Sequence, residues 1–162
     1  GSSNNKALEI YNASQSTIPS GTLTVRAYAC STSCPTGTTT SATLNITKDL
    51  LPGETYVIAN TSAVAELKAR ANILNGSSVA SFNGNDTLTL VAGTSATLLD
   101  SFGQINVYPG AAWTVNGVTT VDQTLRRKDA IVQGDTTATD AFDPSAQWNA
   151  FAVNTYAGLG TR

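Results

Sequence analysis

The sequence Asp100-Ser101-Phe102-Gly103-Gln104 is the centre of a longer stretch, from Leu98 to Gly160, that decides the fold of this chain. Both tryptophans and three of the four phenylalanines lie within that stretch. Because large aromatic side chains bury more area than other residues, we expect much of the core to come from it. The rest of the chain consists mostly of short β-branched runs separated by turn residues, a pattern typical of all-β domains.

The composition is that of a globular domain with few charges. The 162 residues are enough for one domain with a real core, and a hydrophobic content of 41% argues against disorder. Charged residues make up 12% and the net charge is -2, which argues against a nucleic-acid footprint over the whole surface. Histidine is absent, so the commonest general base and the commonest zinc ligand are both missing.

Alternating and β-branched runs predict strands along the whole chain. Their ranges are 6–12, 22–29, 42–46, 55–60, 86–91, 97–102, 113–115, 118–121 and 148–153. Asn83-Gly84 and Asn116-Gly117 each predict the turn of a β-hairpin. Short strands at near-regular spacing favour a β-sandwich, and we find no linker or repeat that would divide the chain.

One short helix is predicted at residues 62–71. Ser62 is a suitable N-cap residue, and Val64 and Leu67 fall on one face of the helix. We expect this helix to close one end of the sandwich.

A set of short phrases, in order over nearly all of residues 6–160, carries a family resemblance. The phrases are Lys6-Ala7-Leu8-Glu9-Ile10-Tyr11-Asn12, Gly53-Glu54-Thr55-Tyr56-Val57-Ile58-Ala59-Asn60, Phe82-Asn83-Gly84-Asn85-Asp86, Asp100-Ser101-Phe102-Gly103-Gln104, Thr124-Leu125-Arg126-Arg127-Lys128, Gly134-Asp135-Thr136, Asp140-Ala141-Phe142-Asp143-Pro144, Gln147-Trp148 and Gly158-Leu159-Gly160. In these phrases the chain resembles the lamin-tail domain as it occurs in bacterial secreted proteins.

The resemblance implies an all-β, immunoglobulin-like β-sandwich with one short helix, as a single domain at residues 6–160. Residues 1–5 are then an N-terminal extension or a tag remnant. Bacterial members are accessory modules, often attached to secreted nucleases or phosphatases, or stand-alone surface proteins, and the family has no shared catalytic residues. The chain departs from the family at Thr137-Ala138, where many members carry Asn-Gly.

Cys30 and Cys34 are the two cysteines, and they lie in a loop of small polar residues. Two cysteines cannot supply the four ligands of a structural zinc site. A small disulfide is the favoured interpretation and implies an oxidising compartment, while a reduced pair stays an alternative because so short a loop gains little from closure.

Arg126, Arg127 and Lys128 form the one basic cluster of the sequence. They are candidates for phosphate contact, as in an accessory domain of a nuclease. Strand alternation would send Arg127 to the face opposite the other two, so we favour an ion-paired strand beside the acidic loop that follows.

Asp135, Asp140 and Asp143 lie within nine residues and are candidates for a calcium site, since carboxylate oxygens suit that ion. Their spacing does not match the EF-hand loop. We favour the alternative, in which these carboxylates cap turns and pair with the basic cluster.

The aromatic residues Phe102, Tyr108, Trp113 and Trp148 allow two interpretations. They could form a stacking platform for a sugar, but large aromatics in a small sandwich more often belong to the core. Ser101 has no histidine to activate it, and no pair of carboxylates is placed together by the sequence. We therefore expect no catalytic activity and no cofactor, calcium being the one candidate.

These observations favour a secreted or cell-surface, non-catalytic protein with a structural or adhesive role. Its expected partner is another copy of itself or another surface protein, reached through sheet edges and through chain ends that are free to extend. Two alternatives are an accessory domain of a secreted nuclease that contacts DNA, and a calcium-dependent carbohydrate-binding module. No run of the sequence is apolar for long enough to span a membrane.

Overall fold

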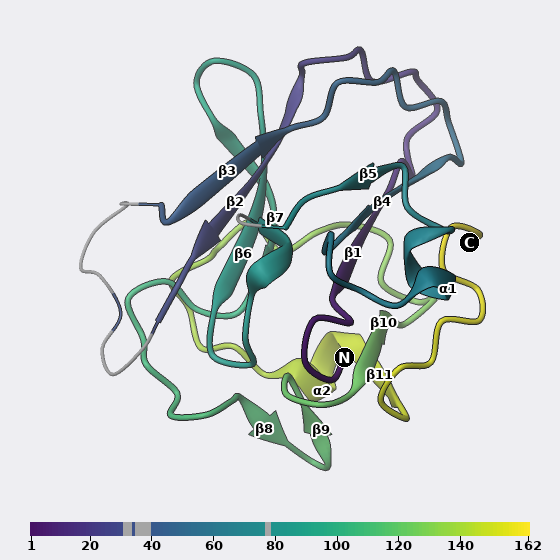
Figure 1. Ribbon diagram of the computed structural model, residues 1–162. Helices are drawn as coiled ribbons and strands as arrows, with labels where there is room; N and C mark the ends of the chain where they lie inside the picture. Colours follow the sequence, from purple (N-terminus) through teal and green to yellow (C-terminus); the bar gives the residue numbers. More distant parts are fainter. Residues whose placement is uncertain (31–33, 35–39, 77–78) are drawn as a thin grey trace.

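The computed structural model describes residues 1–30, 34, 40–76 and 79–162 (Figure 1). Most of its regular structure is strand, as predicted. The larger sheet has four strands in the order β3-β2-β6-β7. They are β2 (Leu23–Tyr28), β3 (Ala42–Asn45), β6 (Thr87–Ala92) and β7 (Thr97–Phe102), and all neighbours in this sheet are antiparallel.

The second sheet has three strands in the order β1-β4-β5. Here β1 (Ala7–Tyr11) is antiparallel to β4 (Thr55–Ala59), and the two-residue β5 (Ile73–Leu74) is parallel to β4. The strand β1 is therefore an edge of this sheet, and β4 lies in its centre.

The main apolar core lies between the two sheets. Leu23 and Val25 of β2 belong to the same buried cluster as Tyr56 and Ile58 of β4. Alternate residues of each strand point to one face, so the period-two pattern of the sequence supplies both inner surfaces. The predicted β-sandwich is confirmed, and one core shared by both sheets makes them a single unit.

A second, smaller apolar cluster covers the outer face of the three-stranded sheet. Ala59 of β4 packs there with Leu67 of the helix α1 (Ala65–Lys68) and with Tyr156 and Leu159 of the C-terminal segment. Figure 1 shows the C-terminus beside α1. Because β4 is covered on both faces, its last four residues are all buried.

Two small two-stranded sheets and a second helix complete the described fold. These are β8 (Thr114–Val115) with β9 (Val118–Thr119), and β10 (Thr124–Arg127) with β11 (Trp148–Phe151). The helix α2 (Pro144–Gln147) comes directly before β11, and a 3-10 turn, η1 (Val79–Ser81), precedes β6. Asn116-Gly117 joins β8 to β9 with positive φ at both residues, which confirms that hairpin.

Several finer predictions about elements are wrong. The first helix is four residues long and starts after Val64, which is 46% exposed, and no side chain caps it. The described residues form two α-helices rather than one, because Asp143 accepts a hydrogen bond from the N–H of Ser145 and so caps α2. Asn83-Gly84 follows η1 rather than a strand, so it makes a turn but no hairpin.

The prediction that the chain ends are free to extend is wrong, because both ends contact the domain. Ser2 donates its backbone N–H to Oδ1 of Asn154 at 3.1 Å, and Oδ1 of Asn5 accepts from the N–H of Val64 at 3.0 Å. Burial lowers the pKa of the Gly1 amino group. The side chains of small polar residues make these contacts, and hydropathy patterns do not report them.

Candidate functional site

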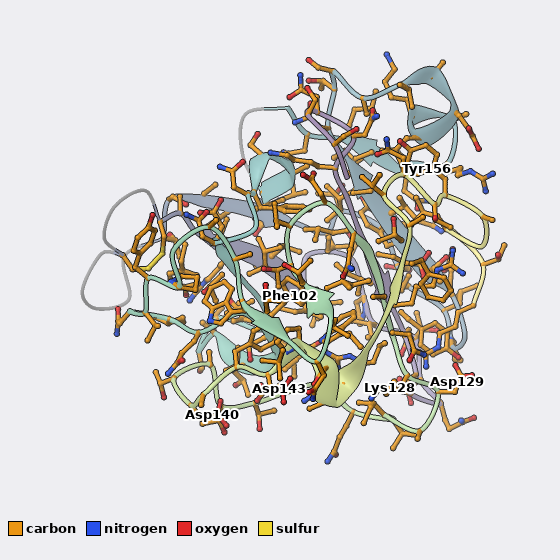
Figure 2. The ribbon with its side chains drawn as sticks, turned by 90° about the horizontal axis from the view of Figure 1, so that it is seen from below. Phe102, Lys128, Asp129, Asp140, Asp143 and Tyr156 are labelled. Carbon is orange, nitrogen blue, oxygen red and sulfur yellow. A yellow bond between two sulfur atoms is a disulfide. The ribbon has the colours of Figure 1, made fainter. Side chains whose placement is uncertain are left out.

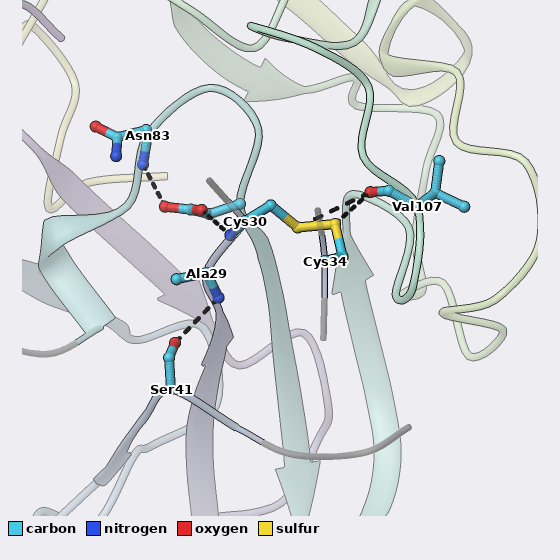
Figure 3. The surroundings of a disulfide bond; sticks show 7 residues. Ala29, Cys30, Cys34, Ser41, Asn83 and Val107 are labelled. Atoms are coloured by element: carbon cyan, nitrogen blue, oxygen red, sulfur yellow. Dashed lines mark hydrogen bonds between the residues drawn. A yellow bond between two sulfur atoms is a disulfide. The ribbon is translucent and has the colours of Figure 1, made fainter. Parts of the chain in front are cut away.

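The cysteine pair forms a disulfide, as predicted, and it lies beside a buried carboxylate (Figure 3). Asp86 is 5% exposed and accepts hydrogen bonds from the N–H groups of Cys30 and Asn83, both at 2.7 Å. The backbone oxygen of Val107 lies 2.7 Å from Sγ of Cys34. Asp86 therefore holds the end of β2 against the start of β6, and its oxygens are occupied by this structural role.

Asp100 on β7 is a second carboxylate with a structural role. It lies 2.8 Å from Arg127 of β10 and also accepts the N–H of Asp135 at 2.9 Å. Gly134 fits against this group so closely that a Cβ atom there would lie 2.7 Å from Cβ of Asp100 and closer still to the backbone oxygen of Leu99. The outer side of β7 is therefore covered by the segment around Gly134.

The basic cluster is divided among different parts of the fold, and each of its cations contacts the chain itself. The guanidinium of Arg126 contacts the backbone oxygen of Ala157, and Lys128 donates to the backbone oxygen of Ser145 at 2.7 Å. Arg127 is ion-paired, but its partner is Asp100 and not the acidic loop. Candidate phosphate contacts at these positions would have to compete with these internal partners.

The three acidic candidates line one small hollow of about 160 Å³. The N–H of Thr137 donates to Asp135, as expected for a carboxylate that caps a turn, whereas the N–H of Ser145 donates to Asp143, which caps the helix α2 rather than a turn. Their predicted pairing with the basic cluster is wrong. Within the part of the chain that is described, no three acidic, histidine or cysteine side chains are grouped so as to hold a metal ion. Figure 2 shows Asp140 and Lys128 on opposite sides of α2.

The aromatic residues form a packed cluster rather than an open platform. Phe102 lies edge-on to Trp148 and to Phe142, with ring centroids 5.1 and 5.2 Å away, and Phe142 contacts Trp113 in the same way at 5.6 Å. Tyr108 lies outside the cluster and is 42% exposed. The core interpretation is confirmed for Phe102, Trp113 and Trp148, which join β7 to β11 and to the β8–β9 region.

An open polar hollow of about 480 Å³ lies where the C-terminal residues meet the three-stranded sheet. Its lining includes Arg70, Asn72 and the last three residues of the chain. Glu54 also lines it, and a hydrogen bond from Lys48, together with one from the backbone N–H of Leu51, lowers the pKa of that carboxyl. Arg70 forms an exposed ion pair with Glu66 at 3.5 Å.

The outer edge of β1 is the side of this strand that faces away from β4. Lys6 accepts the N–H of Asn60, and Asn12 donates to Glu54, so the even-numbered residues of this strand bond to β4. Strand alternation then points the N–H and C=O groups of Ala7, Glu9 and Tyr11 away from β4. In the described residues, no backbone group bonds to these outward groups.

The C-terminal segment holds the side chains of this edge. Oε2 of Glu9 accepts the N–H of Gly160 at 2.5 Å, and the guanidinium of Arg162 lies over the ring of Tyr11, 4.9 Å from its centroid. Glu9 and Tyr11 lie within the predicted strand at residues 6–12 but were missed as candidates for a functional site. Their alternation with Leu8 and Ile10 was the available signal, but the sequence could not show that they contact residues 151 positions away.

Comparisons with models of protein families, with curated proteins and with solved structures found no match. Among the described residues, no helix has the length and apolar character that crossing a bilayer requires.

Proposed function

We propose that this chain is a secreted or cell-surface module of the lamin-tail type that acts by contact, as a structural or adhesive protein without catalysis. The open edge of β1 carries the proposal. Such an edge presents a row of backbone donors and acceptors to which an extended segment of another chain can add as a further strand.

The environment of this edge supports strand addition. The strand β1 is five residues long, its central residue Glu9 is exposed, and its inner residues Leu8 and Ile10 are only partly buried although they pack against the core. An added strand would cover those two apolar side chains. On the other sheet, the segment around Gly134 already covers the side of β7.

The disulfide supports an extracellular site of action. Such bonds persist in oxidising compartments and are rare where thiols are kept reduced. A closed, disulfide-linked sandwich with few charged residues suits a protein that must keep its shape outside the cell.

The two alternatives have less support. Binding of DNA through Arg126, Arg127 and Lys128 would require cations that already contact Ala157, Asp100 and Ser145. A carbohydrate platform would require exposed rings, and three of the four candidate rings pack edge-on against one another or against Phe142.

Sedimentation velocity over a range of concentrations tests the proposal. We expect association of the wild-type chain with itself or with an extracted surface fraction, and weaker association of Glu9→Pro than of Glu9→Gln. Both variants lose the carboxylate, but proline also removes an outward N–H that makes no bond to β4. Circular dichroism checks that both variants fold. Equal association of the two folded variants, or none for the wild type, would contradict the proposal.

A further inference from the structure

The outer edge of β1 carries charges and outward backbone groups that are complementary to those of the same edge on a second copy of the chain. Resting on the function proposed above, we propose that β1 of a second copy pairs antiparallel with β1 about a two-fold axis at Ile10. Glu9 of each copy then lies opposite Tyr11 and Arg162 of the other copy.

The two charges of this edge, on Glu9 and Arg162, are not paired with each other in the described part of the chain. Glu9 accepts one hydrogen bond, from the N–H of Gly160, and Arg162 stacks on Tyr11. Neither Glu9 nor Arg162 takes part in the three ion pairs found among the described residues. Both residues are exposed. One face of the edge therefore presents an anion at position 9 and a cation over position 11.

The register follows from which side chains face each other. Outward backbone groups must meet outward groups, so Glu9 can lie opposite residue 7, 9 or 11 of the partner strand. If Glu9 lay opposite Glu9 of the second copy, the two carboxylates would repel each other. If it lay opposite Ala7, its carboxylate would meet no polar group. If Glu9 lies opposite Tyr11, its carboxylate meets the guanidinium of Arg162, which lies over the ring of Tyr11. Directly opposed Cβ atoms lie only about 4.5–5.5 Å apart, so the two charges come close together.

This register also continues the apolar layer. Ile10 would meet its counterpart at the two-fold axis, on the face of the sheet that packs against the main core. The two three-stranded sheets would join into one sheet with the order β5-β4-β1-β1-β4-β5. Because the same edge is used by both copies, the contact closes on itself and gives a dimer rather than an open chain.

Charge reversal tests the pairing. In sedimentation equilibrium we expect Glu9→Arg and Arg162→Glu each to weaken self-association by about tenfold or more, since each variant opposes like charges, whereas the double variant restores it. Restoration is the decisive result, because neither damage to the fold nor a different interface predicts it.

Amide hydrogen exchange of the wild-type chain provides a second readout without substitution. The outward amides of Glu9 and Tyr11 should exchange more slowly as the concentration rises, while those of Leu8 and Ile10, which bond to β4, stay protected throughout. The two-fold pairing would be overturned if the chain self-associated but the double variant did not restore association and amide exchange at Glu9 and Tyr11 did not change with concentration. The proposed function through contact with other proteins would still stand. Binding to another surface protein without self-association would likewise overturn the pairing and leave that function standing. No association with any partner at concentrations of about 1 mM would overturn both.

Discussion

At the scale of single residues, Tyr156 places one buried polar atom beside the second apolar cluster. Its ring packs with Leu159 against Ala59 and Leu67, and its hydroxyl is buried without a hydrogen-bond partner among the described residues. Burial, assisted by the negative charge of Glu66, raises the pKa of this phenol above 10.0. The folded state therefore favours the neutral phenol.

We predict that Tyr156→Phe keeps or slightly raises stability at neutral pH, because it removes an unpaired buried hydroxyl, an effect of up to about 1 kcal/mol. Because its pKa is raised in the folded state, the phenol of Tyr156 contributes to stability below pH 10.0. That contribution is lost as the pH rises through the folded-state pKa. Urea unfolding from pH 7 to 11 should therefore show a steeper loss for the wild type than for Tyr156→Phe. Parallel pH curves would contradict the assignment.

At the scale of elements, the contact between Gly134 and β7 joins a loop to an edge strand. The loop lies against the backbone oxygen of Leu99 and the side chain of Asp100, and the neighbouring N–H of Asp135 donates to Asp100. Arg127 reaches the same carboxylate from β10. One carboxylate thus fixes the positions of three segments.

We predict that Gly134→Ala lowers the free energy of unfolding by at least about 2 kcal/mol, because a backbone oxygen cannot rotate away from the new Cβ. Gly110→Ala is the control. Its Cβ would meet nothing within 4 Å, so it should cost only the strain of a left-handed backbone, about 1 kcal/mol. Chemical denaturation of both variants measures the difference, and equal losses would argue against the close contact.

At the scale of the whole molecule, the disulfide adds a covalent link beside the buried carboxylate of Asp86. The link closes a loop of only five residues, so it removes little entropy from the unfolded chain, and the chain-entropy model gives about 2 kcal/mol. The two sheets and their shared core supply the remaining stability.

We predict that the double variant Cys30→Ala/Cys34→Ala folds and that its Tm is lower by about 4–8 °C. Reduced wild type should melt near the double variant, and reductant should not change the Tm of the variant itself. Differential scanning fluorimetry with and without reductant measures both effects. Failure of the double variant to fold would show that the disulfide does more than close a loop.

By itself, the sequence predicted the all-β class, most strand positions apart from β5 and β10, and the confirmed hairpin at Asn116-Gly117, and it favoured the disulfide. These depend on local chemistry: period-two alternation, turn residues with positive φ, and two cysteines four positions apart. It could not determine the four-residue helix or the cap of α2 by Asp143, because such short helices are stabilised by packing and single hydrogen bonds rather than by a repeating pattern.

Tertiary structure alone decided the candidate site. It paired Arg127 with Asp100, it placed Gly160 and Arg162 on Glu9 and Tyr11, and, among the described residues, it left one side of β1 without a backbone partner. Each of these outcomes joins residues far apart in the chain. Strand order and loop packing select such contacts among many sterically equivalent ones, and no local pattern encodes that selection.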